Sequence, residues 1–249
     1  MVQRLLHKVN HRPFALPERK WGMKQTWNDL LFVHWPVDIK QLQAIVPEQL
    51  ELDVWEGAAW ISAASFRVSN LRLRYIPRLP FLHTFRELNI RTYVRYKGIA
   101  GVYFFSLDAS SIAAVQGARL AGLPYMHANI ILNKTLQSEC YFKSERIDRQ
   151  SQSHSAIFEA AYLPDNQIFY AEAGTLTYWL TERYRMYYMK NQVMAIDLHH
   201  LPWPLQQVQP SIQQNSALTQ LAPQIAFTDP PIHTYTQKLD VLVWPMITI

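Results

Sequence analysis

Cysteine, glycine and long apolar runs are scarce in this sequence of 249 residues. It contains 1 Cys and 7 Gly, and no run approaches the roughly 18 apolar residues that a membrane-spanning helix needs. The single cysteine, Cys140, cannot form an internal disulfide, and no positively charged leader with an apolar segment opens the chain. We therefore expect a cytoplasmic protein without a membrane partner.

The sequence also lacks the short motifs that mark common enzyme and cofactor sites. None of HExxH, CxxC, GxSxG, a Walker loop or GxGxxG is present. The histidines do not form a ligand pattern: His7 and His11 lie on an N-terminal arm, and a strand would point the adjacent His199 and His200 apart. We therefore expect neither a metal site nor a cofactor.

Aromatic residues and proline are abundant where glycine is not. The chain has 8 Trp, 13 Tyr, 11 Phe and 15 Pro, and 49% of its residues are hydrophobic. This balance favours aromatic-rich strands separated by proline-marked turns, with enough apolar surface for a sizeable core. No internal repeat and no linker divides the chain. We predict one domain over residues 1–249, of mostly β (β-rich α+β) class.

The clearest local pattern lies between residues 85 and 125. Polar and apolar residues alternate from Glu87 to Tyr96, as in a strand with one polar and one apolar face. Lys97-Gly98 interrupts the alternation, and a second run rich in Tyr and Phe follows from Val102 to Asp108. The two runs predict an antiparallel hairpin that turns at Lys97-Gly98.

The register of this hairpin predicts a polar cluster. Opposite residues of a hairpin keep a constant sum of their numbers, so an even-length loop sets every pair. The predicted pairs are Arg91 with Phe104, Asn89 with Ser106, and Glu87 with Asp108. One strand face would then gather Glu87, Asn89, Arg91, Ser106 and Asp108. An odd-length loop would separate the cluster, and a polar strand face that simply meets water would show the same alternation.

A helix is expected directly after the hairpin. Ser110 or Ser111 is placed to cap it, and Gly122 and Pro124 are placed to end it. Arg119, near the end of this helix, would bring a cation beside the polar strand face.

Further elements follow from the same kinds of pattern. The first half predicts an N-terminal arm that packs against the body, a strand over 28–35, a helix capped by Asp38, a hairpin over 51–66 turning at Glu56-Gly57, and a surface excursion over 70–85 that is long enough to be a lid. The second half predicts strands over 128–132, 136–146, 154–162 and 168–173, a helical piece within 174–183, a hairpin formed by 184–190 and 193–199, a helix over 211–221 and a closing strand over 240–244.

Positive charge is concentrated in one part of the chain. The formal net charge is +5, and from Arg67 to Lys97 there are eight Arg or Lys residues against one acid, Glu87. Nonspecific nucleic-acid binding needs a continuous basic surface, whereas these arginines alternate along strands and no nucleic-acid motif accompanies them. We expect no nucleic-acid partner. A site for an anionic small molecule, or a solvated strand face, explains this excess of positive charge and needs fewer charges than a nucleic-acid surface does.

Several long segments carry a resemblance to a known family. They are, in chain order, HRPFALP, WGMKQTWNDLLFVHWPV, LELDVWEGAAWIS, FRELNIRTYVRYKGIAGVYFFSLDASS, GARLAGLPY, TERYRMY and HHLPWPLQ. Together they resemble the YqjF-like family of uncharacterised bacterial proteins, over most of the chain. That family is similar in fold to acetoacetate decarboxylase. The resemblance implies a large, closed, mostly antiparallel β-barrel with a central cavity and a few short helices, and no assigned activity.

The more distant relative has a motif that can be compared with this chain. Acetoacetate decarboxylase carries G-R-E-x-x-G-x-P-K-K, in which the first lysine forms a Schiff base and the second lowers its pKa. Gly117, Gly122 and Pro124 match this motif, whereas Tyr125 and Met126 stand where the two lysines would be. A phenol cannot form an imine with a ketone. We therefore expect no Schiff-base decarboxylation at that position.

The sequence thus predicts a barrel that binds a small oxygen-rich or anionic organic molecule. The residues Thr181 to Tyr187 mix charge with aromatic rings, as a pocket rim does, although a surface ion-pair patch would look the same. Two classes of function stay open: a binding protein, or an enzyme that uses Glu87 or Asp108 as a general base for proton transfer, hydrolysis or lyase chemistry. A homo-oligomer also stays open. The candidate ligand-binding residues are Glu87, Asn89, Arg91, Tyr93, Ser106, Arg119, Tyr125, His127 and Arg183.

Overall fold

The computed structural model describes residues 2–77, 83–147, 156–227 and 229–249. The predicted lid over 70–85 lies partly outside these ranges, as does the beginning of the strand predicted over 154–162. Of the lid, residues 70–73 continue a strand and 74–77 form a turn.

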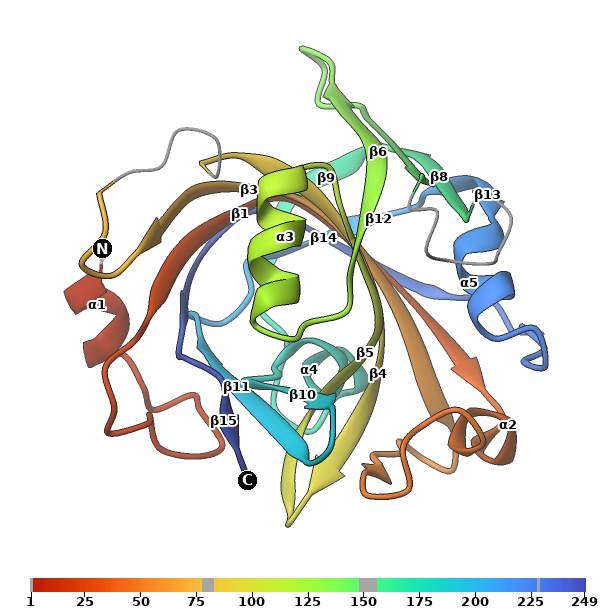
Figure 1. Cartoon of the computed structure of the whole chain (residues 1–249). Helices are drawn as coiled ribbons and strands as arrows, with labels where there is room; N and C mark the ends of the chain where they lie inside the picture. The colour runs from red at the N-terminus through yellow and green to blue at the C-terminus, as the bar shows by residue number, and fades with distance from the viewer. Residues whose placement is uncertain (1, 78–82, 148–155, 228) are drawn as a thin grey trace.

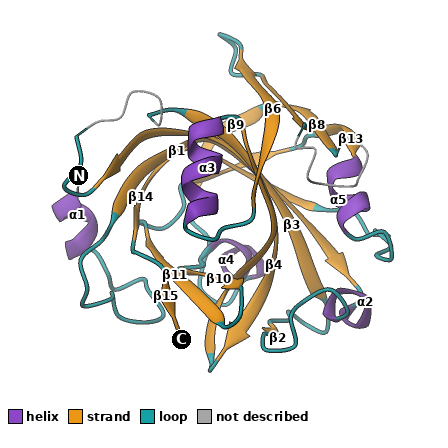
Figure 2. Ribbon diagram, in the orientation of Figure 1, coloured by secondary structure: helices purple, strands orange, loops and turns teal. Residues whose placement is uncertain are grey.

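Strands dominate the architecture, and short helices lie around them (Figures 1 and 2). The strands are β1 (Met23–Val37), β2 (Glu51–Leu52), β3 (Ala59–Leu73), β4 (Phe85–Tyr96), β5 (Ile99–Ala109), β6 (Tyr125–Lys134), β7 (Cys140–Arg146), β8 (Ile157–Tyr162), β9 (Pro164–Phe169), β10 (Arg185–Met189), β11 (Val193–His199), β12 (Leu205–Val208), β13 (Ser211–Asn215), β14 (Ile232–Val243) and β15 (Ile247–Thr248). The helices are α1 (Val2–His7), α2 (Ile39–Gln43), α3 (Ile112–Leu120), α4 (Leu176–Thr181) and α5 (Ser216–Leu221). The predicted β-rich class is confirmed.

The strand pairings run round a ring. From β4 the order is β5, β10, β11, β14, β1, β3 and back to β4, while β6, β7, β8 and β13 continue outward from β5 as a meander. Most pairs are antiparallel, but β5 pairs in parallel with both β6 and β10. The expectation of a mostly antiparallel sheet is therefore confirmed, with β5 as the strand that also pairs in parallel. The physical reason is the crossover through α3, which returns the chain to the start of β6 in the direction of β5.

The β4–β5 hairpin forms as predicted at its turn but not along its whole length. Lys97 and Gly98 have φ values of 48° and 78°, and Tyr96 pairs with Ile99 across them. The register puts Arg91 opposite Phe104, as predicted, and then shifts by one residue because Phe105 is left unpaired in a β-bulge.

Beyond the bulge the predicted pairs are wrong. Asn89 lies opposite Leu107 instead of Ser106, and Glu87 lies opposite Ala109 instead of Asp108. Because a shift of one residue changes the face to which a side chain points, the bulge separates Ser106 and Asp108 from the polar side chains of β4.

Several local predictions are confirmed. Asp38 accepts a hydrogen bond from the backbone N–H of Gln41 at the start of α2, and Ser111 accepts one from Ala114 at the start of α3. Gly122, with φ of 86°, follows the C-cap of α3. The predicted helical piece within 174–183 is α4, and the predicted hairpin of 184–199 is β10 and β11.

Other local predictions need correction. The turn at Glu56-Gly57 exists, but β2 pairs with β4 rather than with β3, so residues 51–66 do not form a two-stranded hairpin. The helix predicted over 211–221 is a strand, β13, followed by the short α5, because residues 211–215 pair with the edge of β8. The closing strand is β14, which begins at Ile232 instead of Asp240 because it pairs along most of β1.

Helix α3 and the N-terminal arm cover the sheet. Figure 1 shows α3 in front of the curved strands, where it contacts β5 and β6, and its buried Val115 belongs to an apolar cluster with Phe66 of β3 and Leu198 of β11. The arm packs through Leu5 of α1 against Leu242 and Trp244. The predicted packing of the arm is therefore confirmed.

The ring is closed at β5 and β10 by a very close backbone approach. Only two residue pairs, Met186 with Val102 and Tyr187 with Tyr103, join the strands. At the adjacent Gly101, a Cβ atom would lie 2.6 Å from the carbonyl oxygen of Arg185 and 2.6 Å from the buried ring of Tyr187. No side chain fits there without a backbone shift.

We expect Gly101→Ala to destabilise the protein by about 1–3 kcal/mol, because the added methyl overpacks the junction between β5 and β10. The matched control is Gly117→Ala in α3. A Cβ atom there meets no atom within 4 Å, so the change should stabilise by roughly 0.5–1 kcal/mol through helix propensity. Urea denaturation of the three proteins measures both values, and equal stability of wild type and Gly101→Ala would contradict the role of this glycine.

Candidate functional site

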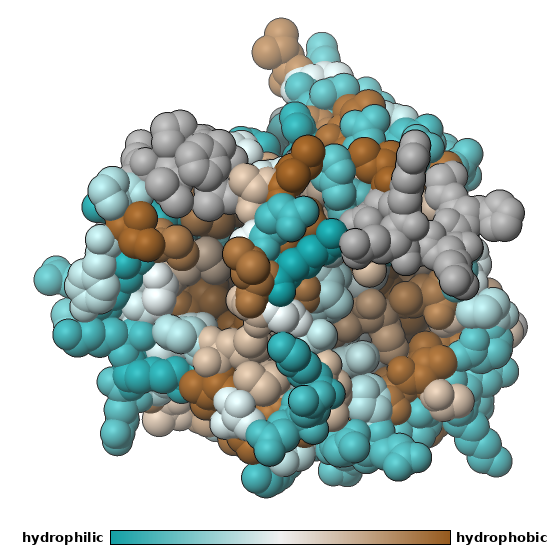
Figure 3. Space-filling view, in the orientation of Figure 1, coloured by the Kyte–Doolittle hydropathy of each residue, from teal (hydrophilic) through white to brown (hydrophobic). Residues whose placement is uncertain are grey.

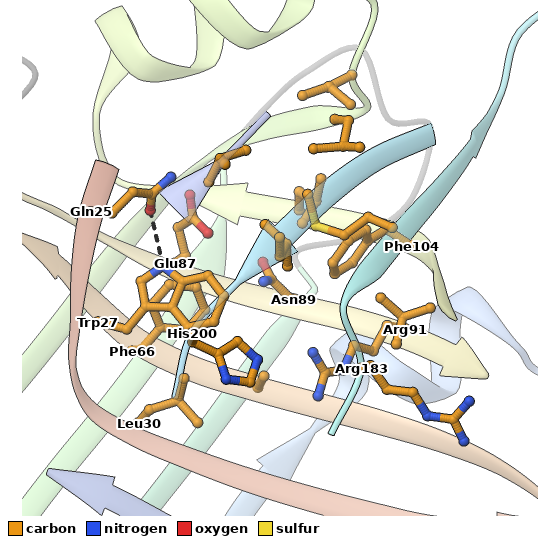
Figure 4. Close-up of a pocket in the computed structure, with 18 of the residues that line it drawn as sticks. Gln25, Trp27, Leu30, Phe66, Glu87, Asn89, Arg91, Phe104, Arg183 and His200 are labelled. Carbon is orange, nitrogen blue, oxygen red and sulfur yellow. Dashed lines mark hydrogen bonds between the residues drawn. The ribbon is translucent and has the colours of Figure 1, made fainter. Parts of the chain in front are cut away.

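The inward face of β4 meets a cavity with a volume of about 110 Å³. Glu87, Asn89 and Arg91 line it in alternation along the strand, and Figure 4 shows Asn89 between the other two. The opposite walls come from β1, β3, β5, β10, β11 and the α3–β6 loop. Figure 3 shows a hollow beside α3 with apolar atoms visible inside it, on the side of β1 and β14. The space is many times what one water molecule requires, roughly 10–15 Å³.

Glu87 is a buried carboxyl group at one end of the row, with 5% of the residue exposed. It accepts a 2.9 Å hydrogen bond at Oε1 from the hydroxyl of Tyr125, at the start of β6. Burial raises the pKa of Glu87 to about 7, and the hydrogen bond from Tyr125 lowers it only in part. Near neutral pH this group can therefore act either as a proton donor or as an acceptor.

Arg91 is a buried guanidinium group at the other end of the row, with 9% of the residue exposed. Its Nε and Nη2 atoms have no hydrogen-bond partner, and no carboxylate within the described ranges forms an ion pair with it. The ring of Phe32 lies 4.9 Å from its guanidinium carbon. Burial lowers the pKa of Arg91. The amide oxygen of neighbouring Asn89 also lacks a partner.

Arg183 lines the same cavity, but the carboxylate of Asp53 compensates its positive charge. Its Nη1 donates a 2.5 Å hydrogen bond to Asp53, and its Nε donates to the backbone carbonyl of Trp179 at 2.6 Å. Tyr93 stacks beneath its guanidinium group at 5.0 Å and hydrogen-bonds with Nδ1 of His34 at 2.8 Å. Tyr93 itself does not line the cavity, so it supports Arg183 from behind the wall.

The remaining sequence candidates lie elsewhere. Ser106 and Asp108 point away from the cavity because of the bulge, and Asp108 pairs with Arg146 of β7 at 2.8 Å. Arg119 donates from Nε to the carbonyl of Tyr125 at 2.8 Å, which fixes the α3–β6 loop rather than lining the cavity. His127, two residues further along β6, does not line the cavity either.

Sequence patterns missed several lining residues. His200 reaches the wall from just after β11, with Trp203 beyond it and Trp27 on β1. The Nδ1–H of His200 donates to the carbonyl of Leu201 at 2.8 Å, and burial lowers the pKa of His200 to about 3, so the imidazole is neutral. The adjacent His199 points away toward the carbonyl of Leu5, as expected for neighbours in a strand. The HHLPWP segment, which contains His200 and Trp203, was the sequence signal that could have identified them. No pattern within that segment indicates that it lies near β4 in the fold.

No group of three His, Cys, Asp or Glu side chains in the described part of the chain is arranged to hold a metal ion. No helix within the described ranges is long and apolar enough to cross a membrane.

Comparisons with known proteins agree with the fold. The family model DUF2071, described as an uncharacterized conserved protein, matches residues 24–240. The chain is 43% identical over 244 residues to the uncharacterized protein YqjF of Bacillus subtilis, covering 97% of this chain and 98% of that protein.

Solved structures with the same fold include enzymes. An acetoacetate decarboxylase from Legionella pneumophila superposes with a TM-score of 0.62 at 15% identity, covering 97% of this chain and 93% of that one. The enduracididine biosynthesis enzyme MppR, with HEPES buffer bound, gives a TM-score of 0.61 at 11% identity, covering 93% and 89%. At such identities the similarity establishes the fold alone.

The raised pKa of Glu87 predicts a pH dependence of stability. The folded protein holds the Glu87 proton more tightly than the unfolded chain does. The protonated carboxyl group therefore stabilises the fold fully below the ordinary pKa of 4.5, and this stabilisation is lost as pH rises to about 7. Wild type should lose about 3 kcal/mol over this window relative to Glu87→Gln, which cannot ionise. Urea denaturation of both proteins at pH 4.5, 5.5, 6.5 and 7.5 checks this, and parallel curves would contradict it.

Proposed function

The chain belongs to the DUF2071 family of uncharacterized conserved proteins, and from that premise we propose that its central cavity binds a small organic anion through Arg91. The observation that carries the proposal is a buried guanidinium group at the cavity wall that no carboxylate of the described chain compensates. Natural proteins rarely bury a charge without a partner, since removing it from water is costly.

A bound carboxylate would supply what Arg91 lacks. Its two oxygens match the planar fork of a guanidinium group and accept two charge-assisted hydrogen bonds, here from Nε and Nη2. The contrast with Arg183 supports this assignment, because Asp53 already compensates that second arginine. A cavity enclosed by strands also suits a small molecule better than a polymer.

A Schiff-base mechanism is not part of the proposed function. The acetoacetate decarboxylase resemblance puts a lysine where this chain has Tyr125, whose hydroxyl is bound to Glu87. Among the described residues, no lysine lines the cavity. Lys134, one of the nearest in sequence, is held by Asp29 and Tyr235 through hydrogen bonds of 3.0 and 3.1 Å.

Proton transfer by Glu87 is a second candidate function. It is favoured by one observation, a buried carboxyl group in the cavity whose pKa is raised to about 7. Asp108 is a weaker candidate for this role because it is paired with Arg146. Exchange of deuterium into a bound carbonyl compound, present in wild type and absent in Glu87→Gln, would distinguish an enzyme from a binding protein.

Loss of Arg91 should weaken anion binding. We expect Arg91→Gln to bind carboxylates roughly 10- to 100-fold more weakly than wild type, because hydrogen bonds to a charged group are lost. Isothermal titration with benzoate and octanoate measures this. The matched control, Arg72→Gln, removes the same charge from an exposed position of β3 and should leave both affinities unchanged. Equal binding by Arg91→Gln and wild type would contradict the proposal.

No imine should form with a β-keto acid. An imine requires an unprotonated amine inside the cavity, and the walls described above offer a phenol and guanidinium groups instead. After incubation with acetoacetate and borohydride, the intact mass should be unchanged. A stoichiometric adduct on any lysine, including Lys190 near the α3–β6 loop, would restore a Schiff-base mechanism.

A further inference from the structure

The polar groups of the cavity are spread along β4. Glu87, Asn89 and Arg91 occupy alternate positions, so the Cα atoms of the first and last lie about 13 Å apart at the usual rise of a strand. Figure 4 shows Glu87 and Arg91 at the two ends of the row, with Asn89 between them. The bulge lies in β5, so it does not shorten this spacing. A ligand that touches both ends must therefore be elongated.

The two ends offer different chemistry. At one end the guanidinium group of Arg91 carries a permanent charge that no carboxylate of the described residues pairs with. At the other end Glu87 contacts the hydroxyl of Tyr125, and no arginine or lysine among the described residues forms an ion pair with it. Only the Arg91 end can therefore neutralise an anion.

The walls between the two ends are mostly apolar. Leu30 and Phe32 of β1, Phe66 of β3, Phe104 and Leu107 of β5 and Ile196 of β11 all line the cavity. Such walls suit the hydrocarbon part of a ligand, with a few polar side chains such as Asn89 and His200 among them.

Building on the proposed function, we infer that the ligand is a monocarboxylate with an elongated apolar body and one uncharged polar group at its far end. Its carboxylate meets Arg91, its apolar body lies along the aromatic and aliphatic walls, and its distal hydroxyl or carbonyl group meets Glu87 and Tyr125. Near pH 6 the carboxyl group of Glu87 is mainly protonated, so it can donate to such a group as well as accept from it.

This inference excludes two neighbouring classes of acid. A dicarboxylate would put its second charge beside Glu87, where burial without a cation is costly. A short keto acid such as acetoacetate could occupy only one end of the row. Its carboxylate at Arg91 would leave its carbonyl group far from Glu87.

Four acids test the inference at pH 6 by isothermal titration: octanoate, 8-hydroxyoctanoate, octanedioate and acetoacetate. Three share one chain length and differ only at the distal end. We expect 8-hydroxyoctanoate to bind roughly three- to tenfold more tightly than octanoate, as one added hydrogen bond allows. Octanedioate and acetoacetate should bind at least tenfold more weakly than 8-hydroxyoctanoate.

Glu87→Met is the matched variant, because methionine has a similar length but no polar group. It should remove the advantage of 8-hydroxyoctanoate over octanoate and leave octanoate binding in place. The wild-type ranking alone tests the inference if this variant does not fold.

The outcomes separate the inference from the proposed function. If none of the four acids binds, both are overturned. A second outcome is that the acids bind in an Arg91-dependent way while octanedioate or acetoacetate binds as tightly as 8-hydroxyoctanoate. In that case the proposed function stands, and the inference of an elongated monocarboxylate is overturned. If Glu87→Met still binds 8-hydroxyoctanoate more tightly than octanoate, the proposed function also stands, but the placement of the distal hydroxyl group at Glu87 is overturned.

Discussion

The close approach of β5 and β10 at Gly101 is the contact on which the site depends. It is short, two residue pairs long, and it closes the ring of strands that makes the inner face of β4 an interior surface. With the ring open, Glu87 and Arg91 would meet water, and neither the raised pKa of the carboxyl group nor the uncompensated guanidinium group would exist. A backbone contact that involves neither residue thus affects the electrostatics of both.

The bulge at Phe105 then sorts the polar residues of the hairpin into two groups. On one face, Glu87, Asn89 and Arg91 stay together in the cavity. On the other face, Asp108 pairs with Arg146 and connects β5 to the meander. Without the extra residue, Asp108 would lie opposite Glu87, and two carboxyl groups would share one apolar interior. Among the described residues, the bulge therefore leaves Glu87 as the one carboxyl group that lines the cavity.

The buried and half-buried arginines of this fold differ mainly in which groups pair with them. Arg183 is held by Asp53, and Arg185 is held by Asp197 at 2.7 Å. These pairs tie together segments that are far apart in the chain, as structural ion pairs do. Arg91 is buried to a similar extent and lines the cavity, and no carboxylate of the described residues pairs with it, which is why we propose it as the ligand-binding group.

The sequence by itself determined the features that depend on near neighbours. Alternation along β4, the turn at Lys97-Gly98 and the cap at Ser111 each follow from backbone preferences and hydrogen bonds within a few residues. The long family-like segments likewise identified the family and its fold. Three polar residues of the site, Glu87, Asn89 and Arg91, could be predicted because they lie on one strand.

Only the tertiary structure decided the rest. The extra residue at Phe105 has no local signal, since an unpaired residue in a strand is stabilised by what packs around it. His200 and Trp203 join the site through the ring of strands, and their distance from β4 in the chain hides that contact. Whether an arginine is compensated also depends on partners such as Asp53, which lies 130 residues from Arg183. Charge pairing and burial are properties of the closed ring, so no pattern along the chain could reveal them.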